Sequence, residues 1–172
     1  MGIPSYFSYI VKNHKNILKK KNMLNKDINN FFLDSNSIIY DCMRKIDNFK
    51  NNTSFETTLI KLVCEQIDAY IKIINPSDLV YIAIDGVAPV AKLEQQRNRR
   101  YKSILEKEIF IKTGIIENTL KWDKTAITPG TKFMKKLNER LTKHYNSKIK
   151  NMRVNKIIIS GSDEKGEGEH KI

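Results

Sequence analysis

Three short apolar runs along the chain each stop at polar residues. They are residues 31–33, which end at Asp34, residues 79–84, which end at Asp85-Gly86, and residues 156–160, which hold Ile157-Ile158-Ile159. A short continuous apolar run bounded by polar or turn residues is typical of a buried strand. The pattern therefore predicts three buried strands with polar side chains at their carboxyl ends.

Segments with apolar residues at three- and four-residue steps predict amphipathic helices between these strands. One such segment ends at Asn75-Pro76 and carries Leu59, Ile60, Val63, Ile67, Tyr70, Ile71 and Ile74. Two more helices are expected from about Ala91 to Lys112 and from about Pro129 to Lys150, the second with Thr128 as its N-cap. Shorter helices are expected after Pro4-Ser5, ahead of a lysine- and asparagine-rich stretch over residues 12–30, and from Glu169 onward.

Strands that alternate with helices predict an α/β fold with a largely parallel sheet. In such sheets, functional side chains gather where the carboxyl ends of the strands meet. This arrangement would bring Asp34, Asp85, Glu167 and Glu169 to one edge of the sheet. With 172 residues, the chain suits one domain or an incomplete part of a larger one.

Four carboxylates at one edge predict a site for divalent cations. They would repel one another unless cations neutralise them, and hard oxygen ligands favour Mg²⁺ or Mn²⁺. Such sites hydrolyse phosphate esters. The alternative is that an Asp after a strand is a helix cap or a turn residue, but the Gly166-Glu167-Gly168-Glu169 sequence is harder to explain in that way.

Nucleic acid is the partner class that the charge favours. The chain has 31 Lys and Arg against 19 Asp and Glu, a net charge of +12. On a helix, Lys92, Gln96, Arg99 and Arg100 fall on one face, and guanidinium, ammonium and amide donors suit a terminal phosphate. The alternative is a solvated basic face that binds nothing in particular.

Two sequence features bear on the cellular compartment. Cys42 and Cys64 have no neighbouring cysteine or histidine pair, so they are expected to be buried thiols in a reducing compartment rather than a disulfide or a zinc site. The lysine-containing start of the chain lacks a signal peptide, and no apolar run is long enough to span a membrane. We therefore expect a soluble cytoplasmic protein without a membrane partner; the nucleus or a viral replication compartment is the alternative.

Six blocks of the sequence resemble the N-terminal conserved region of the Xrn-type 5′-to-3′ exoribonucleases. The blocks are Met1–Pro4, Leu33–Ile39, Ile82–Pro89, Gln95–Arg100, Ile127–Thr131 and Gly166–Ile172. The resemblance implies that residues 1–172 are the N-terminal portion of such a catalytic domain. It implies a flap-endonuclease-like (PIN-like) α/β core with helices on both faces of the sheet. It also implies Mg²⁺-dependent release of mononucleotides from single-stranded RNA that bears a 5′ monophosphate, with Mn²⁺ as a substitute metal.

The resemblance also assigns roles to individual residues. Asp34, Asp85, Glu167 and Glu169 match the family's first acidic metal ligands, and Lys92, Gln96, Arg99 and Arg100 match its 5′-phosphate pocket. Tyr40 stands where the family usually has a histidine that stacks on the first base, and an aromatic face can still stack there. Val90 replaces a commonly basic residue. Asn36 would orient the metal ligands without touching the metal.

In the family, further aspartates and further domains follow this region, beyond Ile172 of this chain. The domain is therefore expected to be incomplete at its C-terminus and inactive on its own. A downstream region or a separate polypeptide would complete the site. Two other functions remain as alternatives. One is an RNA-binding fragment without catalysis, and the other is a flap-type DNA nuclease, against which the Gln95–Arg100 block argues.

Overall fold

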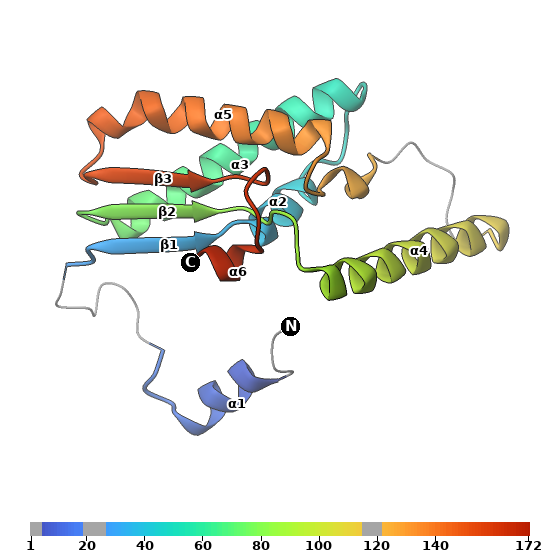
Figure 1. Ribbon diagram of the computed structural model, residues 1–172, viewed down its shortest axis with the longest axis horizontal. Coiled ribbons are helices and arrows are strands. Elements are labelled where there is room, and N and C mark those ends of the chain that lie inside the picture. The colour runs from blue at the N-terminus through green and yellow to red at the C-terminus, as the bar shows by residue number, and fades with distance from the viewer. Residues whose placement is uncertain (1–4, 19–26, 115–121) are drawn as a thin grey trace.

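A three-stranded parallel sheet forms the centre of the molecule in the computed structural model, which describes residues 5–18, 27–114 and 122–172 (Figure 1). The strands are β1 (Asn30–Asp34), β2 (Leu79–Ala83) and β3 (Lys156–Ser160), in the order β1-β2-β3. Asp34 pairs with Ala83 and Ala83 with Ser160, so the three carboxyl ends lie level at one edge. The predicted α/β fold with a parallel sheet is confirmed.

Helices occupy most of the rest of the described chain. They are α1 (Tyr6–Asn13), α2 (Asn36–Met43), α3 (Asn52–Ile74), α4 (Val90–Lys112), α5 (Lys132–Lys148) and α6 (Gly168–Lys171), with short 3-10 helices η2 (Lys124–Ala126) and η3 (Ile149–Asn151). The Met1–Pro4 block and part of the lysine- and asparagine-rich stretch lie outside the described residues.

The core lies on one face of the sheet. Helices α3 and α5 bury their apolar stripes there against alternate strand residues, among them Val80 and Ile82 of β2. Right-handed crossovers that advance from β1 to β2 to β3 place successive helices on the same side, which explains why α3 and α5 share a face. On the other face, Phe32 is 44% exposed and packs against Tyr81 at 6.1 Å between ring centroids. The prediction of three buried strands is therefore right for β2, whereas β1 and β3 are edge strands with partly open side chains.

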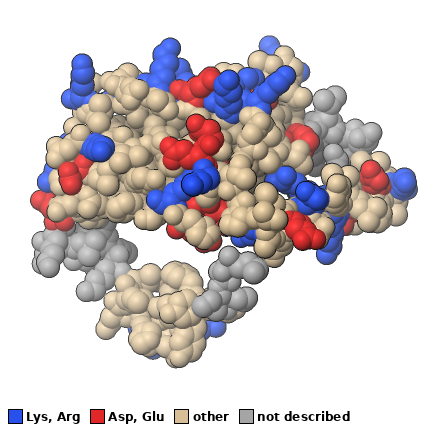
Figure 2. Space-filling view, in the orientation of Figure 1, with Lys and Arg blue, Asp and Glu red and all other residues tan. Residues whose placement is uncertain are grey.

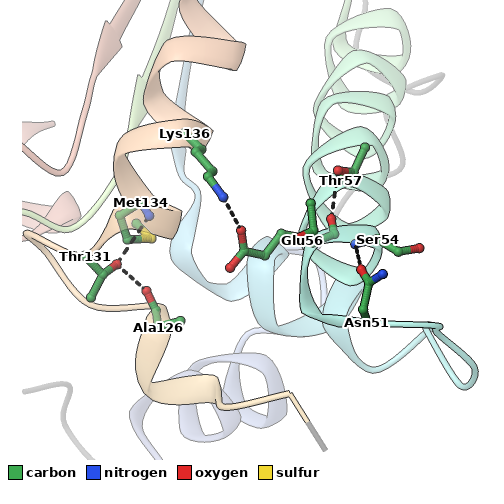
Figure 3. A network of polar contacts seen from close by, with 9 residues as sticks. Asn51, Ser54, Glu56, Thr57, Ala126, Thr131, Met134 and Lys136 are labelled. Carbon is green, nitrogen blue, oxygen red and sulfur yellow. Dashed lines mark hydrogen bonds and ion pairs between the residues drawn. The ribbon is translucent and has the colours of Figure 1, made fainter.

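Two helix starts differ from the sequence-based expectation because polar caps, rather than apolar periodicity, decide them. Helix α5 begins at Lys132, not Pro129, since Gly130 has a positive φ of 86° and the Thr131 hydroxyl accepts the Met134 N–H (Figure 3). Helix α3 begins before Leu59, where the Asn51 side chain accepts the Ser54 N–H at 2.8 Å (Figure 3).

Both cysteines are buried free thiols, as expected. Burial is the main cause that raises the pKa of the Cys64 thiol to about 11, so this thiol stays protonated and unreactive at neutral pH. In the described ranges, no helix is long and apolar enough to cross a membrane.

An ionic cluster joins α3 to α5 at a distance from the acidic residues of the sheet edge. Asp68 of α3 lies 2.9 Å from His144 Nε2 and also accepts a hydrogen bond from Lys148 Nζ, both of α5. Burial alone would raise the pKa of Asp68, but the hydrogen bonds from Lys148 and His144 outweigh it and hold the pKa below the ordinary value of 3.8.

We expect Asp68→Asn to lower the free energy of unfolding by about 1–3 kcal/mol at neutral pH, because it removes the charge that these donors bind. The pKa of Asp68 is lower in the folded state than the ordinary value of 3.8. The stabilisation by the charged carboxylate is therefore fully present above pH 3.8 and is lost as the pH falls through the pKa of the folded state. Urea unfolding of both proteins at neutral and acidic pH measures the difference. In the exposed Lys61–Glu65 pair, Glu65→Gln is the control and should change stability by less than about 0.5 kcal/mol. A deficit in Asp68→Asn that persists at strongly acidic pH would contradict the expectation.

Candidate active site

The four acidic residues singled out in the sequence reach the same edge of the sheet. Asp34 is the last residue of β1, Asp85 follows β2, and Glu167 and Glu169 lie at the start of α6. Backbone pairing brings the two later segments together, because Gly86 N donates to Gly166 O at 2.8 Å and Gly166 N donates to Val87 O at 3.0 Å.

Two glycines permit this close approach. A Cβ atom on Gly86 would overlap the carbonyl oxygen of Glu164. A Cβ atom on Gly168 would lie 2.6 Å from Asp34 Oδ1. Glycine is therefore required at position 86, where the overlap is with backbone, whereas a Cβ atom at position 168 would force the Asp34 carboxylate to move.

Asp85 is held from two sides. Asn36 Nδ2 donates to Asp85 Oδ2 at 2.6 Å, and Asn36 Oδ1 accepts the Asp85 N–H at 3.2 Å. Gly168 N donates to Asp85 Oδ1 at 2.7 Å. These contacts fix the orientation of the carboxylate and leave further oxygen lone pairs for a ligand. Asn36 thus contacts both the carboxylate and the backbone N–H of Asp85, as expected for a residue that orients this side chain.

The electrostatics of Asp34 show that the carboxylates lie near one another. Burial is the first cause that raises the pKa of Asp34, and repulsion by Asp85 is the second. The hydrogen bond from the Asn36 backbone opposes them, and weaker repulsion by Glu169 and Glu167 again raises this pKa. Repulsion among carboxylates is what a bound cation relieves. Oxygen donors of this kind fit a hard divalent cation such as Mg²⁺.

One candidate ligand was not foreseen from the sequence. His170, with Glu167 and Glu169, forms a group whose ligand atoms all lie within 4.8 Å of one another. The signal for it was its position three residues after Glu167, which brings both side chains to one side of a helical turn.

Helix α4 contacts the acidic site directly. Lys92 Nζ lies 3.3 Å from Glu167 Oε2, and Gln96 Nε2 donates to Glu167 Oε1 at 3.4 Å. In Figure 2, basic and acidic side chains adjoin where α4 leaves the body of the molecule, while other Lys and Arg side chains are scattered over the visible face. The acidic residues and the basic helix thus form one continuous site.

A cavity of about 460 Å³ lies between α4 and the carboxyl edge of the sheet. Gln96, Arg99 and Arg100 line it on the side of α4, and Asn36, Tyr40, Asp85 and Gly86 line it from the sheet and α2. The structure thus brings three of the four predicted phosphate-binding residues together with Tyr40. Lys92 lies outside the lining and contacts Glu167 instead.

The opposite wall of the cavity was not predicted as part of the site. Lys124, Thr125, Ile127, Thr128 and Pro129 line it there. The Ile127–Thr131 block was recognised in the sequence, but neither periodicity nor residue type indicated that it would face α4.

Comparisons with known proteins bear on this site as a whole. A family model described as XRN 5'-3' exonuclease N-terminus matches residues 1–172. The chain is 38% identical over 181 residues to 5'-3' exoribonuclease 1 of Saccharomyces cerevisiae and 33% identical over 183 residues to that of Homo sapiens. It is 32% identical over 213 residues to 5'-3' exoribonuclease 2 of Gallus gallus.

All of this chain is covered in each comparison, but it spans only 12%, 11% and 22% of the lengths of these three relatives. Nucleases of this family are metal-dependent in general, which agrees with an edge rich in carboxylates. The match over the whole chain confirms the resemblance drawn from the six sequence blocks, and the chain belongs to the XRN 5'-3' exonuclease N-terminal family.

Proposed function

We propose that this chain is the N-terminal portion of the catalytic domain of a 5′-to-3′ exoribonuclease that acts on single-stranded RNA with a 5′ monophosphate. A downstream region or a separate polypeptide completes the site. The observation that carries the proposal is that Asp85 belongs both to the acidic cluster and to the lining of the basic cavity. A phosphate held by the cavity therefore lies next to the carboxylates.

In this proposal Asp34, Asp85, Glu167 and Glu169 hold Mg²⁺, for which Mn²⁺ can substitute. The metal supplies activation of water and neutralisation of the leaving oxygen. Asn36 and the Gly168 N–H orient Asp85. Lys92 and Gln96 hold Glu167 in place, so that the acidic cluster is arranged before substrate arrives.

The cavity explains the proposed 5′-to-3′ direction of degradation. Arg99 and Arg100 offer guanidinium donors to a terminal phosphate, and Gln96 adds an amide. Tyr40 lines the same cavity and stacks on the first base, an interaction worth roughly 1–3 kcal/mol. A substrate anchored by its 5′ phosphate presents its first internal phosphodiester to the carboxylates, so one nucleotide is released at a time.

Product analysis tests the proposal. The protein that contains this chain should release mononucleotides from 5′-phosphorylated single-stranded RNA when Mg²⁺ is added, and flap DNA should be a poor substrate. Faster cleavage of the flap would favour the DNA nuclease. Binding of RNA without release of nucleotides would favour the module that binds but does not cut.

We further expect RNA with a 5′ monophosphate to bind more tightly than the same RNA with a 5′ hydroxyl, and this preference to shrink about 10- to 100-fold in Arg100→Ala. The loss corresponds to roughly 1.5–3 kcal/mol for hydrogen bonds to a charged group. Arg97→Ala is the matched control, since Arg97 lies on the same helix outside the cavity lining. Titration with both RNAs in a metal chelator measures the preference. An equal effect of the two variants would leave α4 as a general basic face.

A further inference from the structure

The wall opposite α4 is anchored in the core at two points. Trp122 and Ile127 are 9% and 6% exposed, and the Trp122 ring stacks on Phe55 at 4.9 Å and meets the edge of Phe133 at 5.1 Å. The segment between these anchors contains η2 and contributes Lys124 and Thr125 to the lining of the cavity. Core packing therefore fixes where this segment lies against α3 and α5.

Hydrogen bonds within the segment fix its backbone. Asp123 Oδ1 accepts the Thr125 N–H at 2.9 Å, and Asp123 Oδ2 accepts the Thr125 hydroxyl at 2.6 Å. The Thr128 hydroxyl donates to Thr125 O at 2.6 Å, and the Thr131 hydroxyl donates to Ala126 O at 2.5 Å. The wall is thus arranged in advance of any ligand, which lowers the entropic cost of binding.

Lys124 is the charged member of this wall, since the other residues that line the cavity from the described part of the segment are Thr125, Ile127, Thr128 and Pro129. It lines the same cavity as Arg99 and Arg100. Its side chain is exposed, so its ammonium group can move toward a ligand at little cost. Three cationic side chains from two separate elements therefore surround one space.

We propose that Lys124 is a further substrate-binding residue, which contacts the 5′-terminal phosphate from the side opposite α4. The inference rests on the proposed function. A terminal phosphate carries roughly 1.5 to 2 negative charges and three strong acceptor oxygens, so it can accept hydrogen bonds from more than one side of the cavity. A compact ammonium with three donors complements the planar guanidinium groups. Lys124 thereby strengthens selection of the phosphorylated 5′ end over an internal phosphodiester.

The test compares the affinity of a short single-stranded RNA with a 5′ monophosphate to that of the same RNA with a 5′ hydroxyl, in a metal chelator so that no cleavage occurs. In Lys124→Gln the preference for the phosphorylated RNA should fall about tenfold, as expected for one lost charge-assisted contact. Lys124→Arg should retain most of it. Lys132→Gln is the matched control, because Lys132 is also exposed but lies outside the cavity lining.

The outcomes separate this inference from the proposed function. If the unmodified protein shows no preference for the 5′ monophosphate, the proposed function fails. Two other outcomes overturn the assignment of Lys124 to the terminal phosphate while the proposed function stands. In the first, the unmodified protein prefers the 5′ monophosphate and Lys124→Gln keeps this preference. In the second, Lys124→Gln lowers the affinity for both RNAs equally.

Discussion

Replacement of Gly86 by alanine is expected to lower the free energy of unfolding by about 3 kcal/mol or more and to weaken Mg²⁺ binding together with it. The added methyl group would overlap the Glu164 carbonyl oxygen and lie 3.1 Å from that of Gly166. Backbone atoms cannot move aside as a flexible side chain does, so the paired segments must separate. Gly168, which donates to Asp85 Oδ1, lies two residues after the paired Gly166, so we expect the acidic cluster to open as well. Urea unfolding and calorimetric titration with Mg²⁺ measure the two effects.

Gly114→Ala is the control for this experiment. Gly114 has a positive φ of 71°, but within the described part of the chain, and apart from its own chain neighbours, no heavy atom lies within 4 Å of a Cβ atom built there. The substitution should therefore cost only about 1–2 kcal/mol, from backbone strain, and leave Mg²⁺ binding unchanged. Equal losses of stability and Mg²⁺ binding in the two variants would contradict this account. They would show that backbone strain, rather than the clash between residue 86 and the Glu164 carbonyl, causes the effect.

Asp85→Ala is expected to reduce Mg²⁺-dependent turnover about 10³-fold while RNA binding stays near normal or becomes stronger. Loss of a metal ligand removes several kcal/mol of transition-state stabilisation, and each 1.36 kcal/mol is a factor of ten. Removal of a negative charge from the cavity lining also reduces repulsion of the substrate phosphates. Single-turnover kinetics and RNA titration in a chelator separate the two quantities.

The matched control is Asp78→Ala, since Asp78 is an exposed aspartate that precedes β2 at the opposite end of the strand. It should change neither turnover nor RNA affinity appreciably. Near-normal turnover of Asp85→Ala in saturating Mg²⁺ would remove Asp85 from the site, and a matching loss in Asp78→Ala would point to instability of β2 rather than to catalysis.

The sequence predicted the strand ends well because parallel strands bring their carboxyl ends to one edge whatever the details of the helices. That rule placed Asp34 and Asp85 together without knowledge of any contact. The contact between Lys92 and Glu167 did not follow from the sequence. Helical spacing puts Lys92 on the same face of α4 as Arg100. It does not predict which residues of other elements contact each end of that face, and at the Lys92 end the contact is with Glu167.

Helix α2 and the wall that carries Lys124 were missed for different reasons. Helix α2 has only eight residues, with Ile38, Ile39 and Cys42 as its buried positions. Unlike the equally short α1, which follows Pro4 in the sequence, it has no preceding proline to signal its start. The wall is irregular, and its shape comes from side-chain hydrogen bonds to the backbone and from Trp122 in the core. Such a shape depends on contacts between residues that are distant in the sequence, and the local pattern of apolar and polar residues does not reveal these contacts.

The backbone pairing of Gly86 with Gly166 bears on when the acidic edge forms as the protein folds. The Asn36–Asp85 contact spans 49 residues of chain and the Gly168–Asp85 contact spans 83. Contacts that close long loops form late, because they bear the largest entropic cost. The β1–α3–β2 unit can assemble first, and residues 161–172 join it only after β3 has paired with β2. We therefore expect the hydrogen bond from Gly168 to Asp85, which joins the last part of the acidic edge to the rest, to form in the last step of folding, after α3 has packed.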